Sequence, residues 1–228
     1  MREEGQPKKT VSIAIDGPAG AGKSTISKAL ARSLGFVYID TGAMYRCVAL
    51  YALEHGIDTH NSDGALARAL SDISIDLTQT HVYLNGRDVT DAIRTPQVSI
   101  GASDVAVVRE VRLFLVEQQR ALARARSVVM DGRDIGTYVL PDADIKIFLT
   151  ATVQDRAKRR HEELVEKNGD AAPGYEQILK DMEYRDKNDA SRAFAPLRQA
   201  DDAVRMDTTS NTLAQSIDMI TNYVKERL

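Results

Sequence analysis

The sequence predicts an α/β protein in which helices cover both faces of a five-stranded parallel sheet, a three-layer α/β/α arrangement. Three observations predict this fold. Short apolar segments typical of buried strands alternate with helical patterns through most of the 228 residues. A glycine-rich loop separates the first strand from the first helix. One segment that breaks the alternation, about residues 61–96, carries a hairpin signal.

The glycine-rich loop follows a β-branched run at residues 11–15, "VSIAI", and precedes a helical pattern that stops at Gly35. Its spacing fits G-x-x-x-x-G-K-[ST], which indicates a phosphate-binding P-loop when it lies between a strand and a helix. The defining positions are Gly17, Gly22, Lys23 and Ser24. A turn that only lets strand and helix pack closely would explain the glycines, but not the lysine and serine. The predicted fold is therefore that of the P-loop NTPases.

The loop predicts a site for the phosphates of a nucleoside triphosphate, because its backbone N–H groups point inward at the positive end of a helix. Lys23 is expected to reach the β- and γ-phosphates, and the Ser24 hydroxyl to bind Mg²⁺ directly. Asp16 or Asp131, each next to a strand-end glycine, is expected to orient the ion through water. The residues expected to bind the nucleotide are Gly17, Pro18, Ala19, Gly20, Ala21, Gly22, Lys23, Ser24 and Thr25.

The remaining elements follow in chain order, and ligands are expected beyond the carboxyl ends of the strands. Further strands are expected at residues 36–40, 127–132, 144–150 and 203–208. Helices are expected at residues 43–55, at 95–125 with a break near Val107, at 153–167, and from Thr212 to the C-terminus.

Residues 11–228 are expected to form a single core with two additions. The hairpin signal is Asn85-Gly86, and an antiparallel hairpin does not belong in a parallel sheet. It is expected in an inserted subdomain at about 42–104 that contains a small antiparallel sheet. Residues 166–177, with two glycines and a proline, are expected to form a mobile flap, and a short lid is expected at about 155–175. Residues 1–10 are expected to be a flexible tail.

Composition excludes several classes of protein. The net charge of −3 argues against bulk binding to nucleic acid or acidic membranes, and no apolar run approaches the length of a membrane span. The single cysteine, Cys47, rules out an intrachain disulfide and suits a reducing cytoplasm. The four histidines lack metal-ligand spacing. A cytoplasmic monomer is expected.

Arginines are expected at the ligand-binding edge of the sheet. Arg46 follows the second strand and Arg133 the third, so both should lie beside the P-loop. The GTPase strings N-K-x-D and D-x-x-G are absent from the sequence. Solvated ion pairs would be the simpler explanation of any one arginine. Several convergent arginines, however, are what an enzyme needs to hold two polyanions together, because positioning and charge neutralisation supply most of the catalysis of phosphoryl transfer. A two-substrate phosphotransferase is favoured.

Five strings together resemble the bacterial-type cytidylate kinases: "DGPAGAGKST", "DTGAMYR", "DGRDIGT", "PDADIKIFL" and "RDKNDASRAFAPL". The resemblance runs from about Val11 to the C-terminus. It implies transfer of the γ-phosphoryl group of ATP to CMP or dCMP, with Mg²⁺ bound to the ATP. Relatives commonly carry serine at Thr41 and arginine at Lys187, which leaves the order of CMP and dCMP open.

The resemblance also implies roles for individual residues. The positions that match the family's CMP contacts are Thr41, Arg46, Arg133 and Arg192 for the phosphate, Ser103, Arg112 and Asp134 for the base, and Arg185 and Asp189 for the ribose. The residues expected to act in catalysis are Lys23 and Arg133, with Arg156, Arg159 and Arg160 on the lid.

A carboxylate at Asp134 suits cytosine, because the exocyclic N4 amine is a donor where uracil has a carbonyl oxygen. Asp134 could instead form an ion pair with Arg133 or cap a helix before Ile135. A kinase of the same fold with another acceptor, such as UMP or TMP, and a non-catalytic P-loop nucleotide switch remain alternatives.

Overall fold

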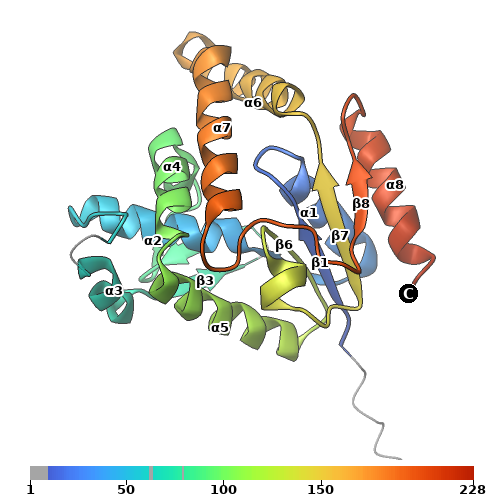
Figure 1. Ribbon diagram of the computed structural model, residues 1–228, viewed down its shortest axis with the longest axis horizontal. Coiled ribbons are helices and arrows are strands. Elements are labelled where there is room, and N and C mark those ends of the chain that lie inside the picture. Colours follow the sequence, from blue (N-terminus) through green and yellow to red (C-terminus); the bar gives the residue numbers. More distant parts are fainter. Residues whose placement is uncertain (1–9, 62–63, 79) are drawn as a thin grey trace, which may run out of the picture.

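The computed structural model describes residues 10–61, 64–78 and 80–228. Residues 1–9 of the expected tail lie outside this range. The central sheet is parallel, with the strand order β2-β6-β1-β7-β8 (Figure 1). Its strands are β1 (Ser12–Asp16), β2 (Val37–Asp40), β6 (Val128–Gly132), β7 (Ile145–Thr150) and β8 (Val204–Asp207). The predicted five-stranded sheet and its strand positions are confirmed.

Helices cover both faces of the sheet, because each presents an apolar stripe to it. On one face lie α1 (Lys23–Leu34) and α8 (Leu213–Lys225), which share an apolar cluster with Ile13 and Ile147. On the other face lie α5 (Arg109–Ala125) and a short π-helix, η3 (Ile135–Val139), packed on Val128 and Met130. The three-layer arrangement is thus the predicted one.

The insert between β2 and β6 has its own apolar core and its own antiparallel sheet, β3-β4-β5. Asn85 and Gly86 both have positive φ, 51° and 76°, as a tight hairpin turn requires, so the hairpin signal was correct. Its elements are α2 (Thr41–Glu54), α3 (Ala65–Ala69), η1 (Leu70–Asp72), β3 (Ile75–Leu77), β4 (Val82–Leu84), β5 (Arg87–Asp88), η2 (Ala92–Arg94) and α4 (Pro96–Val105). The break expected near Val107 separates α4 from α5.

Residues 166–177 differ from the irregular segment that the sequence predicts. Helix α6 (Val153–Asn168) continues into a 3₁₀ turn, η4 (Gly169–Ala171), and a second long helix, α7 (Tyr175–Ser191), begins soon after. The two helices form a hairpin around Ala157, Leu164, Ile178 and Met182. Helix α7 is otherwise polar, so its sequence carries only a weak helical signal, and its packing on α6 and α4 stabilises it.

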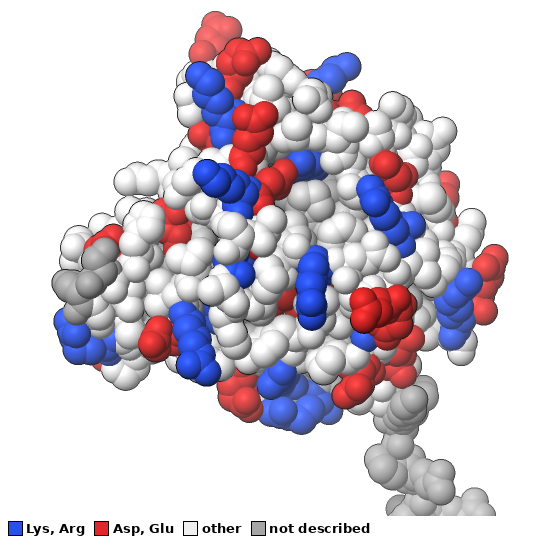
Figure 2. Space-filling view, viewed as in Figure 1, with Lys and Arg blue, Asp and Glu red and all other residues white. Residues whose placement is uncertain are grey.

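On the face shown in Figure 2, acidic and basic side chains are interspersed, and basic residues form no continuous area there. Within the described ranges, no helix has both the length and the apolar character of a membrane span. Cys47 is buried in the insert core and free.

Candidate active site

The P-loop joins β1 to α1 in the predicted strand–loop–helix order. A Cβ added to Gly17 (φ 147°) would lie 2.1 Å from the carbonyl oxygen of Leu149, so no other residue fits without a backbone shift. Gly20 and Gly22 also have positive φ, which glycine adopts without strain. Lys23 Nζ donates to the carbonyl oxygen of Pro18 at 2.7 Å and is buried. Burial, and then the charge of Arg133, lower the pKa of Lys23, and the charges of Asp131, Asp189 and Asp16 offset this only in part.

Beside the P-loop lies a set of oxygens that suits a hard divalent cation. Ser24 Oγ donates to Asp131 Oδ2 at 2.9 Å, and the Tyr38 hydroxyl donates to Oδ1 at 2.8 Å. Burial, and then the charge of Asp40, raise the pKa of Asp131 to about 6. The described residues contain no cluster of three or more His, Cys, Asp or Glu that could hold a metal ion. Mg²⁺ usually takes one or two protein oxygens and completes its shell with water and substrate phosphates, so Ser24 Oγ and the Asp131 carboxylate are the oxygens here that could hold it.

The two aspartates that the sequence left as alternatives have different surroundings. Asp131 contacts Ser24, whereas both oxygens of Asp16 accept backbone N–H groups of Ile135 and Gly136. Of the two aspartates, only Asp131 forms a hydrogen bond with Ser24, which makes it the better candidate for orienting an ion there.

A cavity of about 1000 Å³ lies between the P-loop, the insert and the α6–α7 hairpin. Of the residues expected at the site, the structure brings together around this cavity Ala19, Gly20, Ala21, Gly22, Lys23, Ser24, Thr25, Thr41, Arg46, Ser103, Arg112, Asp131, Arg133, Asp134, Arg159, Arg160, Arg185, Asp189 and Arg192. Gly17, Pro18, Asp16 and Arg156 are not among the lining residues.

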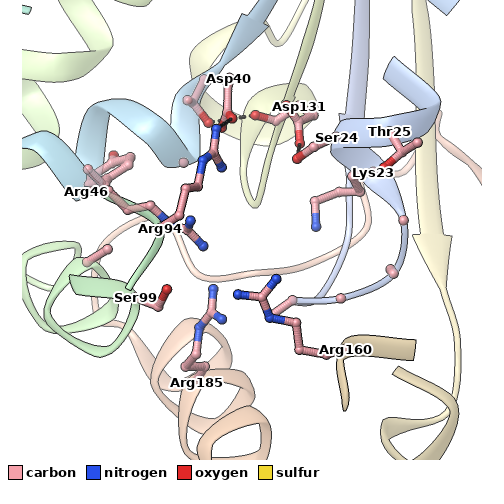
Figure 3. A pocket seen from close by; sticks show the side chains of 18 of the residues that line it. Lys23, Ser24, Thr25, Asp40, Arg46, Arg94, Ser99, Asp131, Arg160 and Arg185 are labelled. Carbon is pink, nitrogen blue, oxygen red and sulfur yellow. Dashed lines mark hydrogen bonds and ion pairs between the residues drawn. The ribbon is translucent and has the colours of Figure 1, made fainter. Parts of the chain in front are cut away.

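Arginines from separate elements converge on this cavity (Figure 3). Burial, and then the charges of Arg185 and Arg94, lower the pKa of Arg46 to about 9. Burial, and then Arg133, lower the pKa of Arg185 to about 10. Guanidinium groups that depress one another's pKa lack sufficient anionic partners, so the cluster is suited to a bound polyanion.

Arg94, at the end of η2, is a cavity residue that the sequence did not single out. Its Nη2 donates to Asp40 Oδ2 at 3.1 Å, and its side chain is 34% exposed. In the sequence Arg94 follows the hairpin and is distant from every strand of the main sheet. The search for arginines just after predicted strands therefore did not find it. No local sequence pattern marks Arg94 as a cavity residue, because its position depends on how the insert folds.

Deep in the cavity, a buried ion pair joins the two elements expected to read the base. Arg112 of α5 donates through Nη2 to Asp134 Oδ2, with side chains 0% and 5% exposed. Asp134 pairs with Arg112 and not with Arg133, and its side chain makes no helix-capping bond. Both simpler explanations of Asp134 are therefore ruled out.

Several donors around this ion pair have no partner among the described residues. They are Ser103 Oγ, Arg112 Nε, and Nε and Nη2 of Arg192, all buried. A buried polar group without a partner is costly, so these atoms mark a place for a polar ligand.

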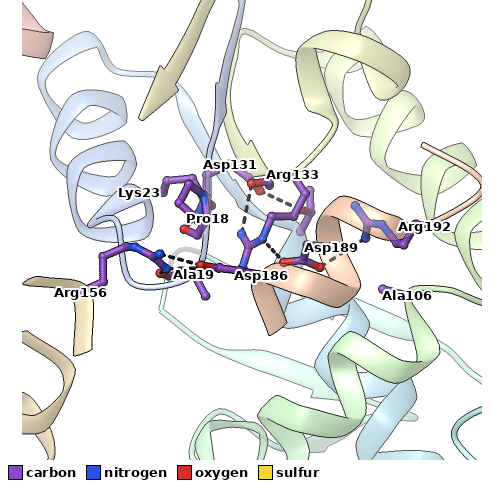
Figure 4. A network of polar contacts seen from close by, with 12 residues as sticks. Pro18, Ala19, Lys23, Ala106, Asp131, Arg133, Arg156, Asp186, Asp189 and Arg192 are labelled. Carbon is purple, nitrogen blue, oxygen red and sulfur yellow. Dashed lines mark hydrogen bonds and ion pairs between the residues drawn. The ribbon is translucent and has the colours of Figure 1, made fainter. Parts of the chain in front are cut away.

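In a second network, Asp189 of α7 pairs with Arg133 and Arg192 (Figure 4). Arg133 Nε donates to Asp189 Oδ2 at 2.7 Å, and Arg192 Nη1 lies 3.6 Å from Asp189 Oδ1. Burial opposes ionisation of Asp189, but Arg133 and Arg192 outweigh it and lower the pKa of this carboxyl. Asp189 is thus a charged link between two arginines expected to bind phosphate.

The Thr41 hydroxyl forms a hydrogen bond within the protein. Its hydroxyl donates to the backbone carbonyl of Asp131 at 2.7 Å, which ties the first residue of α2 to β6. Its lone pairs remain able to accept a bond from a ligand.

The three arginines of α6 that were expected to lie on a lid have different partners. Arg156 is 4% exposed, pairs with Asp186 and donates to the carbonyl of Ala19 at 2.8 Å. Arg159 donates to the carbonyl of Thr208, and Arg160 pairs with Glu163 at 2.8 Å while lining the cavity.

Comparison of the sequence with known proteins identifies the family of the chain. A sequence model of the family described as cytidylate kinase matches residues 13–226. The chain belongs to the cytidylate kinase family. A cytidylate kinase of Halalkalibacterium halodurans is 49% identical over 224 residues, covering 96% of this chain and 100% of that protein. A cytidylate kinase of Caldicellulosiruptor bescii is 52% identical over 215 residues, covering 93% and 94%. The family resemblance predicted from the sequence is confirmed.

Solved structures bear on the fold of this cytidylate kinase family member. A crystal structure of an uncharacterized protein from Eubacterium ventriosum has a TM-score of 0.52 at 16% identity, and the match covers 96% of this chain and 100% of that one. At this identity the likeness concerns the fold alone.

Proposed function

We propose that this protein transfers the γ-phosphoryl group of ATP to CMP or dCMP, giving ADP and CDP or dCDP. The family membership and the names of the relatives support a cytidylate kinase. The observation that carries the choice of acceptor is the buried Arg112–Asp134 pair with unpartnered donors around it, in the same cavity as the P-loop.

The base pocket suits cytosine by its hydrogen-bonding pattern. A carboxylate has about four lone-pair sites, so Asp134 can hold Arg112 and still accept from the N4 amine of cytosine. Arg112 Nε and Ser103 Oγ, both unpartnered, can donate to the carbonyl and ring nitrogen of the base. Uracil would set its carbonyl against the carboxylate and leave buried polar groups unpaired, which is a strong basis for rejection.

The phosphates are held by different residues at the two ends of the cavity. The P-loop amides and Lys23 bind the triphosphate, and binding exchanges the Lys23 bond to Pro18 for bonds to phosphate oxygens. Arg46 and Arg133 hold the acceptor phosphate, whose negative charge relieves the repulsion between these arginines and the neighbouring Arg185. Arg192 contributes its unpartnered donors from the base side.

Phosphoryl transfer then follows from positioning. The acceptor phosphate, with a second pKa near 6, is already largely ionised at neutral pH and requires no general base. Ser24, with Asp131 beside it, would hold Mg²⁺, which when bound neutralises charge on the ATP phosphates. Lys23 and Arg160 stabilise charge on the transferring group, and closure of the α6–α7 hairpin and the insert would exclude water.

The test is ADP release with Mg·ATP and each of CMP, dCMP, UMP, TMP and AMP as acceptor. We expect rapid turnover with CMP or dCMP and about a hundredfold weaker use of UMP. Comparable turnover with UMP would support a nucleoside monophosphate kinase but contradict the proposed recognition of cytosine. Bound ATP with no turnover on any acceptor would favour a nucleotide switch. Monomeric state and cytoplasmic location stay predictions.

A further inference from the structure

A buried aspartate outside the cavity holds the backbone turn that carries Asp134. Asp16, the last residue of β1, accepts the N–H of Ile135 through Oδ1 at 2.8 Å and the N–H of Gly136 through Oδ2 at 2.7 Å. The residue is 4% exposed. Both carboxylate oxygens are therefore used by two consecutive amides of η3.

The direction of the Asp134 side chain depends on this turn, residues 134–139. The carbonyl of Asp134 accepts the N–H groups of Tyr138 and Val139 at 2.9 and 3.1 Å, so Asp134 belongs to the same hydrogen-bonded unit. Its side chain makes no bond within the turn and instead pairs with Arg112 across the cavity. A shift of the turn would move this carboxylate relative to the base.

The space beneath the turn is closely filled. A Cβ added to Gly136 would lie 3.1 Å from Lys146 Cδ and 3.4 Å from Asp16 Oδ2. At the far end of the turn, Arg120 donates to the carbonyls of Tyr138 and Val139 at 2.6 and 2.9 Å. Asp16 and Arg120 thus fix the two ends of the same short element.

We propose that Asp16 is a positioning residue for base recognition: it holds the turn 134–139 so that Asp134 meets the exocyclic amine of cytosine. This inference rests on the proposed function. It also separates Asp16 from metal binding, because Asp16 does not line the cavity and Asp131 alone of the two contacts Ser24.

The substitution Asp16→Asn suits the test because it nearly preserves shape. Burial raises the pKa of Asp16 to about 7 in spite of the two N–H bonds, because it disfavours the charged form, and the asparagine amide carries no charge. The amide keeps one acceptor oxygen and sets an NH₂ group against the other N–H. Asp16→Ala removes both acceptors and should have the larger effect.

The measurements are kcat and KM with CMP and with UMP, KM for ATP, half-saturation by Mg²⁺, and calorimetric binding of CMP without ATP. We expect the CMP-to-UMP ratio of kcat/KM to fall by about tenfold or more in Asp16→Asn and further in Asp16→Ala. Calorimetric affinity for CMP should fall in the same order. KM for ATP and the Mg²⁺ half-saturation should change less than the affinity for CMP, because the side chain of Asp16 bonds to Ile135 and Gly136 and acts on Lys23 of the P-loop only through its charge.

Two further variants secure the interpretation. Gly136→Ala crowds the turn from its own side and should lower the same ratio, whether or not the Asp16 variants fold. Asp104→Asn removes another buried carboxylate, one that accepts from the Tyr184 hydroxyl at 2.8 Å and does not line the cavity, and should leave the ratio unchanged.

The inference would be overturned if the folded Asp16 variants kept the wild-type ratio, or if their Mg²⁺ half-saturation moved while CMP affinity did not. If neither Asp16 variant folded, an unchanged ratio in Gly136→Ala would also overturn it. Failure of the wild-type protein to use CMP would defeat the proposed function itself, which is a separate result.

Discussion

Arg94 Nη2 donates to Asp40 Oδ2 at 3.1 Å, which ties the end of the insert to the end of β2 at the rim of the cavity. Burial opposes ionisation of Asp40, but Arg94 and Arg46 outweigh it and lower the pKa of the carboxyl. Asp40 also caps α2 by accepting the N–H of Ala43 at 2.9 Å. One carboxylate thus pairs with Arg94, attracts Arg46 electrostatically and caps the helix that carries Arg46.

We predict that Arg94, which lines the cavity, also donates to the acceptor phosphate, so Arg94→Gln should raise KM for CMP by about tenfold with little change in KM for ATP. Arg94→Lys should be intermediate, since lysine keeps the charge but not the planar fork. Arg87→Gln is the matched control: Arg87 lies in the same insert, pairs with Glu54 and does not line the cavity. Equal increases in both KM values would contradict this role for Arg94.

Asp134→Ala should lower the free energy of unfolding by about 3 kcal/mol, because it leaves the fully buried Arg112 without its carboxylate. Urea denaturation measures this. The double variant Asp134→Ala/Arg112→Met should recover much of the loss, since a buried pair can be replaced by apolar groups.

Asp134→Asn should relax the preference for CMP over UMP, because an amide can donate as well as accept. Wild-type selectivity in Asp134→Asn would refute the proposed base recognition.

Much of this architecture follows from local sequence patterns. The β-branched runs, the P-loop spacing and the Asn85-Gly86 turn each depend on neighbouring residues, and the structure has each of them in the predicted place. Strand-end position likewise brought Arg46 and Arg133 to the cavity, because parallel strands end at one edge.

Other features depend on contacts distant in sequence and could not be predicted. Asp16 reaches amides 119 and 120 residues away, so its sequence neighbours suggest phosphate chemistry instead. Tyr38 of β2 packs against the apolar core, but its hydroxyl also donates to Asp131, which its sequence neighbours do not indicate. Arg94 enters the cavity only because the insert folds back onto the sheet.

Arg156 and Arg160 were both expected to act on the transferring group, but we expect their substitutions to have different effects. Arg160→Gln should lower kcat by about a hundredfold at saturating substrates without destabilising the protein, because Arg160 lines the cavity and its pair with Glu163 is half-exposed. Arg156→Gln should lower the melting temperature and raise KM for ATP, because Arg156 supports the P-loop through Ala19. Steady-state kinetics with thermal denaturation would distinguish the two, and an unchanged melting temperature in Arg156→Gln would contradict its supporting role.

The last prediction concerns pH and Asp16. Its pKa of about 7 in the folded protein, against 3.8 as the ordinary value, arises from burial, opposed by the N–H groups of Gly136 and Ile135 and by the charge of Lys23, with Asp134 adding to the rise. The folded state therefore binds the proton more tightly than the unfolded chain. Stability from this group is present below about pH 4 and is lost as pH rises to about 7.

Asp16→Asn cannot ionise, so its free energy of unfolding relative to wild type should improve across that window by at most about 4 kcal/mol, at about 1.4 kcal/mol per pKa unit. Urea denaturation of both proteins at intervals from pH 4.5 to 8 gives this difference directly. Taking the difference cancels the titrating groups that do not interact with Asp16. Parallel profiles for the two proteins would mean that the carboxyl is already ionised at low pH, and that its two N–H bonds outweigh the cost of burial.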